Sequence, residues 1–483
     1  MFQKTILGII LFFSSVIVAF FLVIKVIDFN EYKPKIQKTL KEATGYDVAI
    51  KGDITLSLSP VGIRIFDVEV RNTYHKPNDL FAKLDAFDIA VEIVPLFKKE
   101  IKIRHVALEK LDVTIEKNKD GKYNFEQPDT RVKNDKKTKE VNATALPKED
   151  YFSLVNIKKV KFLETNITYK DATTGNKIGA EKINISIDDI SLDSAKHSKI
   201  QGLYFKADAT LDKLYFNKHN IYSLSMNAEM KDALLTMENL KYTLFDSLFQ
   251  GTGKLDISGK VPRISLKHKI QELKLDKVTE ALLGRELLKG QASAELKLAC
   301  LLADETTMKS TLSGFFHLHG DEMSLLGYDL DGIASAIHEP KNFDALFQLF
   351  TQPSKESNVS QTVLKELAIK TEMGYSEIKL SDVALRTEKN RLAVKGALNI
   401  VEEKFLDIKV AFLDQKGCAV FEQTIQGTFK KPKFKLDEST VQAIAEATLS
   451  LIGKSKKSSQ TVAKQEEICT PFYEGDVKHL KLN

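Results

Sequence analysis

Apolar and polar residues alternate along most of this chain, and a period of two residues is typical of half-buried β-strands. The alternation starts after Val48 and is interrupted by turn sequences such as Asn118–Gly121. Each predicted strand has one apolar face and one face of lysine, glutamate and aspartate, so we expect a mainly β protein with a few helices. In the first strands the apolar positions are Ile54, Leu56, Leu58, Ile63, Ile65, Ile89, Val91, Ile93, Leu111, Val113 and Ile115.

An uncharged apolar run from Ile6 to Ile24 precedes the strands. As a helix it would measure roughly 28 Å, close to the hydrocarbon thickness of a bilayer. A cleavable signal peptide is the alternative, but its apolar core is usually shorter and ends at small residues, whereas this run continues through Phe20–Ile24 to Lys25. We therefore expect a retained signal anchor, a transmembrane helix with the body of the chain outside.

The 483-residue chain is long enough for one large extramembrane core or for two domains, and both remain open. Its net charge of +5 is mild and its lysines are spread among acids, so nucleic acid is not expected as a partner. The predicted regions are 1–27, the anchor; 28–125, a helix plus strands; 126–150, a polar linker or excursion; 151–453, an extended β-rich region; and 454–483, a flexible tail with a terminal cysteine segment.

A few segments follow a helical period instead. Tyr32, Ile36 and Leu40 recur four residues apart before Gly45, which predicts a short amphipathic helix. This helix either docks on the sheet behind it or lies on a membrane surface. The further helices expected are Leu275–Leu288, Asn342–Phe350 and Thr440–Ile452.

Two strand regions resemble each other. Ile103–Leu108 can be placed over Ile157–Phe162 with every apolar and basic position kept, and Val113–Ile115 then falls over Ile167–Tyr169 at the same offset. A repeated strand unit favours a serially extended sheet over one closed barrel.

Motifs that carry chemistry are sparse. Gly251–Lys254 is similar to a phosphate loop, but Leu248 stands at the first glycine position and Leu255 follows the lysine. His317 and His319 could share one face of a strand, which makes them a weak candidate metal pair that lacks a third ligand. No catalytic constellation is identifiable, so we expect neither an enzyme nor a cofactor.

The cysteines suggest one disulfide. Cys418 and Cys469 flank the last predicted strand-and-helix unit, and in an oxidising compartment their pairing would hold the tail against the body. Two unpaired thiols are the alternative. Cys300 stands among apolar residues and is expected to be a small buried hydrophobe.

A series of landmark residues runs along the whole chain, including the turn Asp120–Phe125. The other landmarks are Ile27–Asn30, Tyr32, Leu40, Thr44, Gly45, Gly52, Ser59, Pro60, Asp67–Asn72, Leu288–Gly290, Gly327–Leu330 and Gly396. In this order they resemble the AsmA family of diderm bacteria, in its smaller form with one anchor, and the turn is similar to the family's Gly-x-x-Asn-aromatic turn. The sequence departs from the family at Tyr46, where a basic residue is usual, and at Phe125, where tryptophan is common.

The resemblance implies an inner-membrane-anchored protein with the bulk of the chain in the periplasm, where a long, curved, mostly antiparallel sheet forms a groove or taco-like trough. The apolar strand positions given above are then candidates for a groove that holds phospholipid acyl chains, in support of lipid transport and outer-membrane biogenesis. A closed sandwich core would show the same alternation. The alternative function is an assembly factor that carries no lipid and binds outer-membrane or periplasmic proteins through strand edges.

Overall fold

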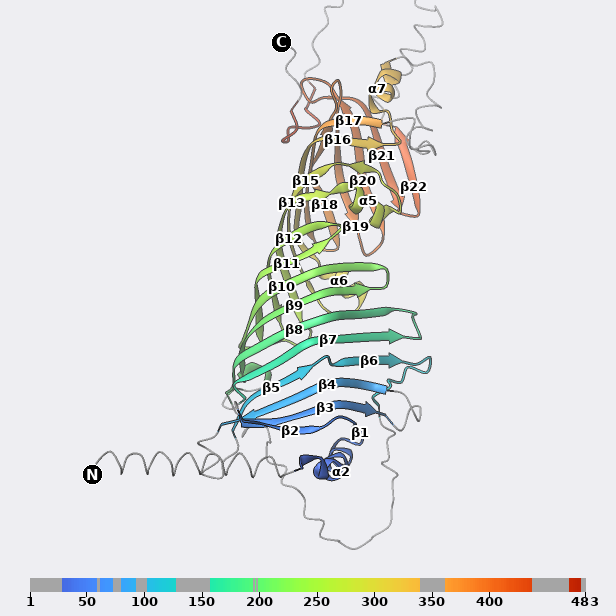
Figure 1. The fold of residues 1–483 in the computed structure, drawn as a ribbon. Helices are drawn as coiled ribbons and strands as arrows, with labels where there is room; N and C mark the ends of the chain where they lie inside the picture. Colours follow the sequence, from blue (N-terminus) through green and yellow to red (C-terminus); the bar gives the residue numbers. More distant parts are fainter. Residues whose placement is uncertain are drawn as a thin grey trace, which may run out of the picture. The chain divides into compact units, whose positions relative to one another are not determined.

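The computed structural model describes residues 28–58, 61–72, 80–92, 102–126, 157–193, 196, 199–338, 361–436 and 469–478. The chain divides into two compact units between Ala233 and Leu234. Both units consist mainly of β-strands (Figure 1). In the described residues, no helix has the length and apolar character needed to cross a membrane. The anchor predicted at 1–27 lies outside the described residues, as does almost all of the predicted linker.

Unit 1 opens with a short 3-10 helix, η1 (Phe29–Tyr32), followed by the helix α2 (Lys33–Thr44). Pro34 lies in the first turn of α2, where a helix has no partner for the N–H that proline lacks. Gly45 ends the helix in the left-handed conformation, with φ of 75°. The amphipathic segment predicted from the sequence is therefore helical, with its first residue in η1.

The strands of unit 1 follow one another in chain order (Figure 1). Most neighbours are antiparallel, as predicted. The elements are β1 (Asp47–Ile50), β2 (Ile54–Leu58), β3 (Val61–Arg71), β4 (Leu80–Val91), β5 (Ile103–Glu109), β6 (Asp112–Lys117), β7 (Lys159–Asp171), β8 (Lys177–Leu192), the helix α4 (Lys199–Gly202), β9 (Leu203–Phe216) and β10 (His219–Lys231).

One pairing in unit 1 is parallel, which makes its sheet mixed. Strands β5 and β6 both pair with β7 in the parallel sense. A parallel neighbour requires the chain to return to the same end of the sheet before the next strand starts, so the connection must be long. The long polar segment between Lys117 and Lys159 provides that connection.

Unit 2 is an antiparallel sheet whose described strands also pair in chain order, except that the two-residue strand β14 pairs with β16. Its elements are β11 (Leu234–Leu244), β12 (Ser247–Asp256), β13 (Arg263–Lys274), α5 (Leu275–Leu283), β14 (Leu288–Lys289), β15 (Gln291–Leu301), α6 (Glu305–Thr311), β16 (Ser313–Leu326), α7 (Leu330–His338), β17 (Gln361–Gly374), β18 (Glu377–Arg386), β19 (Arg391–Asn399), β20 (Lys404–Leu413), β21 (Ala419–Thr428) and β22 (Lys431–Leu436).

The core of unit 2 lies on one face of this sheet, which we call the core face. Helices α5 and α7 pack on it through Leu275 and Ile333, against strand residues such as Met323 and Leu364. Leu364 is completely buried and Ile333 is 1% exposed. Burial of this kind is the ordinary source of folding free energy. Unit 2 therefore has a closed hydrophobic core.

Of the three further helices predicted from the sequence, the described residues include only the first. The predicted helix Leu275–Leu288 is present as α5 but ends at Leu283, because Gly284 adopts a left-handed conformation with φ of 72°. The predicted helices Asn342–Phe350 and Thr440–Ile452 lie outside the described residues. The sequence did not predict α6 and α7.

The second packed face of unit 2 involves residues 469–478, which we call the C-terminal clasp. A disulfide joins Cys469 of the clasp to Cys418, with the two Cα atoms 6.2 Å apart. Tyr473 and Val477 of the clasp then cover small side chains on the sheet. These form one register row across four strands, namely Ala368, Ala384, Ala393 and Ala411.

Candidate functional site

One face of the unit 1 sheet is apolar along its whole length, and we call it the apolar face. Adjacent strands are in such register that apolar residues stand opposite one another across β2, β3, β4, β5, β7, β8, β9 and β10. One row consists of Leu56, Ile63, Ile89, Val106, Val160, Ile187, Ala207 and Ala228. The neighbouring row consists of Ile54, Ile65, Phe87, Leu108, Phe162, Ile185, Ala209 and Met226.

The opposite face of the same strands is polar. The row between the two apolar rows consists of Thr55, Arg64, Asp88, Ala107, Lys161, Ser186, Asp208 and Asn227. Arg64 in this row is paired with acids: it donates a hydrogen bond of 2.6 Å to Glu109 and lies 3.9 Å from Asp88. The polar face therefore provides carboxylates for Arg64 and can lie in contact with water.

The strands of unit 1 share an irregularity. Polar residues with positive φ interrupt several strands, including Asp67 in β3, Glu164 in β7 and Lys182 in β8. The register between β7 and β8 shifts on both sides of Thr165. An extra residue of this kind bends a strand and reverses its alternation.

The sequence compensates for these bulges. In β7 the apolar positions are Val160 and Phe162 before the bulge and Ile167 after it, so the pattern slips by one residue where the backbone does. The same slip separates Ile63 and Ile65 from Val68 and Val70 in β3. The pattern therefore keeps the apolar residues on one face of a bent sheet.

The apolar face of unit 1 is only partly covered. In the two rows, Ile54, Ala209 and Ala228 are buried, whereas the remaining side chains are half-buried or exposed. Ile63, the second residue of the first row, is 43% exposed. Such an unbroken, half-open apolar surface is unusual for a water-soluble sheet. It contrasts with the core face of unit 2, which α5 and α7 cover.

A pocket of about 720 Å³ lies at the first strands of this face, between the sheet and α2. Its lining is almost entirely apolar. It brings together six of the residues that the sequence predicted for a groove, namely Ile54, Leu56, Ile63, Ile65, Ile89 and Val91. Pockets of this size enclose small organic ligands or parts of larger ones.

The other predicted groove residues lie elsewhere. Val113 and Ile115 are in β6, where they pair with Ile167 and Tyr169 of β7 rather than lining the pocket. Leu111 precedes that strand, and Leu58 ends β2. Ile93 lies outside the described residues.

Residues of η1 and α2 form the second wall of the pocket. Phe29, Tyr32, Ile36 and Leu40 contribute apolar surface, and Lys35 and Thr39 are the polar members of this wall. Of these, Phe29 was not predicted, nor was Phe87 of β4. The signal for Phe87 was present in the alternation that continues to Ile89 and Val91.

Side-chain hydrogen bonds hold this wall in place. Asn30 accepts a hydrogen bond of 3.0 Å from the backbone N–H of Ile54, and Gln37 accepts one of 2.8 Å from that of Ile50. Lys33 also lies 3.8 Å from Asp53. These contacts attach the helix to the starts of the strands. Lys35, by contrast, has no carboxylate partner among the described residues.

An ion cluster stands close by on β3. The buried Glu69 accepts hydrogen bonds from Lys51 and Arg71, each of 2.6 Å. These two cations hold the pKa of the Glu69 carboxyl below its ordinary value, although burial opposes the shift. The cluster joins β3 to the segment after β1 and has no free acid or base for catalysis.

The other candidate sites from the sequence, the histidine pair and the segment similar to a phosphate loop, do not form binding sites in the described residues. His317 stacks on Phe315 with 4.5 Å between ring centroids, and His319 lies 3.6 Å from Asp321. Within the described ranges, no group of three or more histidine, cysteine or acidic side chains is placed to hold a metal ion. Gly251–Lys254 lies inside strand β12, so it lacks the helix that follows a phosphate loop. Cys300 is half-buried and unpaired.

These features define a class of protein: a strand-rich protein in which the bent sheet of one unit presents an open apolar face beside an amphipathic helix. Residues 3–218 match the model of the AsmA family, so this part of the chain belongs to that family. The match covers the apolar rows of unit 1 from β2 to β9, whereas their last residues, Ala228 and Met226 of β10, lie beyond it. No curated protein matches the chain. Family membership and the large sheet are consistent with a role in the cell envelope.

Proposed function

We propose that the apolar face of unit 1 binds the acyl chains of phospholipids and that the protein supports phospholipid transport in outer-membrane biogenesis. The observation that carries this proposal is the half-open exposure of the two apolar rows over eight strands. Water contact with so much apolar surface is unfavourable. An acyl chain laid on the rows would remove that contact.

The binding free energy comes from burying the acyl chain of the lipid. Each buried methylene contributes about 0.8 kcal/mol, so a chain of ordinary length needs no charged contact to be held. The strand-to-strand distance is about 4.8 Å, and a row of eight strands is therefore on the order of 35 Å long. That length exceeds a single acyl chain, which suits movement along the row.

The pocket beside α2 is the proposed place of entry. Here the sheet and α2 form two walls, and Lys35 and Thr39 stand on the helical wall. A lysine without a carboxylate partner suits the phosphate of a lipid head group. The acyl chain would then rest on Leu56 and Ile63.

Anchoring and location are part of the proposal. We expect the run Ile6–Ile24 to hold the chain in the inner membrane and the two units to lie in the periplasm. The Cys418–Cys469 disulfide supports an oxidising compartment. Phospholipid, the inner membrane and outer-membrane or periplasmic assembly components are the proposed partners. No enzymatic step is required.

The rival function is an assembly factor that binds envelope proteins through a strand edge and carries no lipid. In unit 2 the last described strand, β22, is such an edge, but it contains Pro432 together with Lys431, Lys433 and Lys435. Proline and lysine are the residues that discourage strand addition at an edge. This favours the lipid-binding function over the rival.

The test is lipid analysis by mass spectrometry of the full-length protein purified in detergent. The variant Ile63→Asp/Ile89→Asp places two carboxylates in one apolar row, and Thr55→Asp/Thr210→Asp is the matched control on exposed polar positions. We expect stoichiometric phospholipid with wild type and control and its loss in the first variant. Circular dichroism establishes that all three proteins are folded. Equal lipid content in all three would refute the proposal.

A further inference from the structure

The face of unit 2 opposite its core face carries a cluster of lysines over β11, β12, β13 and β15. They are Lys241, Lys254, Lys267, Lys269 and Lys297, and all are exposed. We propose that this lysine surface binds an extended acidic segment of a partner protein. The proposal is independent of lipid binding, which uses the other unit.

The register places like charges directly opposite one another. Lys267 of β13 pairs with Lys297 of β15, and Lys269 lies two residues along the same strand. Lys241 and Lys269 lie on either side of Gln250 in one row across three strands. Directly opposed like charges destabilise a sheet, so this arrangement costs folding free energy in the isolated protein.

Lysines outnumber the carboxylates on this surface: Glu295 stands opposite Lys269, and Asp246 and Glu272 line the first depression. Lys267 lies 3.7 Å from Glu295, and this is the single ion pair that the described residues provide for the five lysines. The contrast with the polar face of unit 1 is clear, because there Arg64 lies against both Glu109 and Asp88. A negatively charged partner would supply carboxylates to the lysines that have no ion pair within the described part of the sheet.

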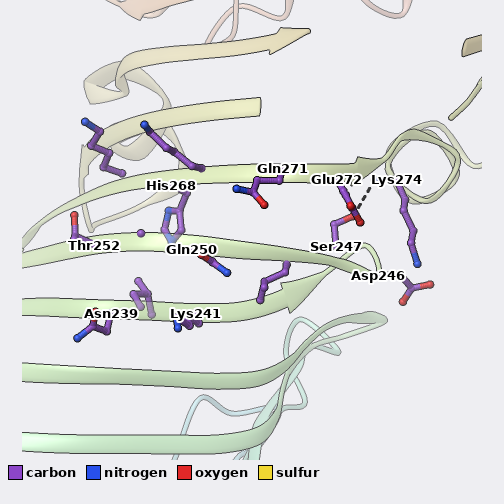
Figure 2. A pocket seen from close by; sticks show the side chains of 15 residues that line it. Asn239, Lys241, Asp246, Ser247, Gln250, Thr252, His268, Gln271, Glu272 and Lys274 are labelled. Carbon is purple, nitrogen blue, oxygen red and sulfur yellow. Dashed lines mark hydrogen bonds between the residues drawn. The ribbon is translucent and has the colours of Figure 1, made fainter. Parts of the chain in front are cut away.

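The lysine surface is hollowed rather than flat. A depression of about 770 Å³ lies over β11, β12 and β13, with Lys241, Lys267 and Lys269 in its lining (Figure 2). A second one, of about 520 Å³, includes Lys254, Lys267 and Lys297. The two share Thr252 and Lys267, so they adjoin.

Neutral polar groups also line both depressions. Gln250, Gln271 and Thr252 line the first depression, and Ser265 and Ser313 line the second. At one end, Ser247 accepts a hydrogen bond of 2.9 Å from the backbone N–H of Lys274, which fixes the turn before β12 (Figure 2). Hydroxyl and amide groups of this kind hydrogen-bond to a peptide backbone as well as to carboxylates.

Shape and spacing identify the occupant. A flat anionic bilayer cannot follow adjoining depressions, whereas a slender chain can lie in them. Successive side chains on one face of an extended peptide are about 6.7 Å apart, which is also the distance between Lys267 and Lys269 along their strand. An extended segment with acidic residues at every second position therefore fits the surface.

The test uses the full-length protein in detergent and a fluorescein-labelled peptide of alternating glutamate and serine, with a glutamine-serine peptide as the neutral probe. Fluorescence anisotropy measures binding at low and at physiological salt. The variant Lys267→Gln/Lys297→Gln removes the opposed pair. The control Lys389→Gln/Lys433→Gln removes two exposed lysines that line neither depression.

We expect the acidic peptide to bind, salt to weaken it, and the Lys267→Gln/Lys297→Gln variant to lose about fivefold or more in affinity while the control does not. The same variant should keep or raise its melting temperature, because a like-charge pair has been relieved. Equal loss in both variants, or absence of peptide binding, would overturn the proposal. So would failure of the peptide together with binding to phosphatidylglycerol vesicles that the first variant alone abolishes.

Discussion

Val106 of β5 and Val160 of β7 stand directly opposite each other in a parallel pair. Val113 and Ile167 do the same in β6 and β7. These are the residues that coincide when the internal repeat of the sequence is superposed, so the offset of the repeat is the register of the two strands. The two copies lie side by side, and like apolar residues meet across the pair.

This register predicts a specific cross-link. In the variant Val106→Cys/Val160→Cys, the two thiols should form a disulfide on oxidation, since opposed residues in neighbouring strands have Cβ atoms close enough for one. The control Ala107→Cys/Val160→Cys places its cysteines on opposite faces and should remain reduced. Mass spectrometry of proteolytic peptides distinguishes the two. A cross-link in the control alone would mean that the register is shifted by one residue.

The C-terminal clasp is predicted to stabilise unit 2. The disulfide closes a loop with a sequence separation of 51 residues, worth about 4 kcal/mol on the chain-entropy model. Tyr473 also donates a hydrogen bond of 2.5 Å to Asp382, and Arg391 donates one of 3.2 Å to the carbonyl of Val477. We therefore expect Cys418→Ser/Cys469→Ser to lower the unfolding free energy of unit 2 and to expose the row of alanines.

Denaturant unfolding of wild type and variant, each with and without reductant, measures this effect. Reductant should lower the midpoint for wild type and leave the variant unchanged. Cys300→Ser is the control and should behave as wild type, because Cys300 is unpaired. If reductant leaves the wild-type midpoint unchanged, the disulfide does not stabilise the clasp.

His268 is predicted to cost stability. It is completely buried against Tyr242 and Phe249, and neither ring nitrogen has a hydrogen-bond partner. Burial lowers the pKa of His268 and raises that of Tyr242 to about 12. Because an unsatisfied buried polar group is unfavourable, His268→Phe should raise the unfolding free energy by about 1 kcal/mol at pH 7.

The pH dependence follows from the sign of that shift. Since the pKa of His268 is lower in the folded state, the unfolded chain binds the proton more readily, and stability falls as the pH drops below about 6.5. Thermal melts between pH 7 and pH 5 should show a decrease that His268→Phe reduces. The exposed His219→Gln should leave the decrease unchanged. A destabilised His268→Phe at pH 7 would contradict this account.

Asn124 is predicted to hold the turn after β6. Its side chain accepts a hydrogen bond of 3.0 Å from the backbone N–H of Glu116 and donates one of 2.7 Å to the carbonyl of Thr114. The side chain of Asn72 in turn donates to the Asn124 carbonyl. Asn124→Ala should lower the unfolding free energy by about 2 kcal/mol in denaturant unfolding, whereas the exposed Lys122→Ala should have little effect. Equal effects would mean that this network is not stabilising.

Much of unit 1 could be predicted from the sequence. The alternation identified the apolar residues of β2, β3 and β4, and the slip between Ile65 and Val68 already marks the irregular backbone at Asp67, where φ is positive. The similarity of β5 and β6 to β7 was detected as a sequence repeat, but a repeat does not predict that its two copies pair in the sheet. Alternation also cannot tell whether a face is covered, since this depends on residues far away in the chain.

The missed elements are short or depend on tertiary contacts. Helix α6 has only 7 residues, about two turns, and its sequence signal is the cap at Asp304, which accepts a hydrogen bond from the backbone N–H of Thr307. Helix α7 is apolar on the side that packs into the core of unit 2, where Ile333 is buried. Phe29 lines the pocket only because Asn30 and Gln37 tie η1 and α2 to the sheet.

The most direct test of the central claim is site-specific photo-cross-linking in living cells. Benzoylphenylalanine is placed in the full-length chain at Ile63 or Ile187 of one apolar row, and at Thr55 or Ser186 on the polar face as controls one register step away. Mass spectrometry then identifies the adducts. We predict phospholipid adducts at Ile63 and Ile187 and none at Thr55 and Ser186. Absence of lipid at all four positions, with protein adducts at Ile63 instead, would contradict the proposed lipid-binding face.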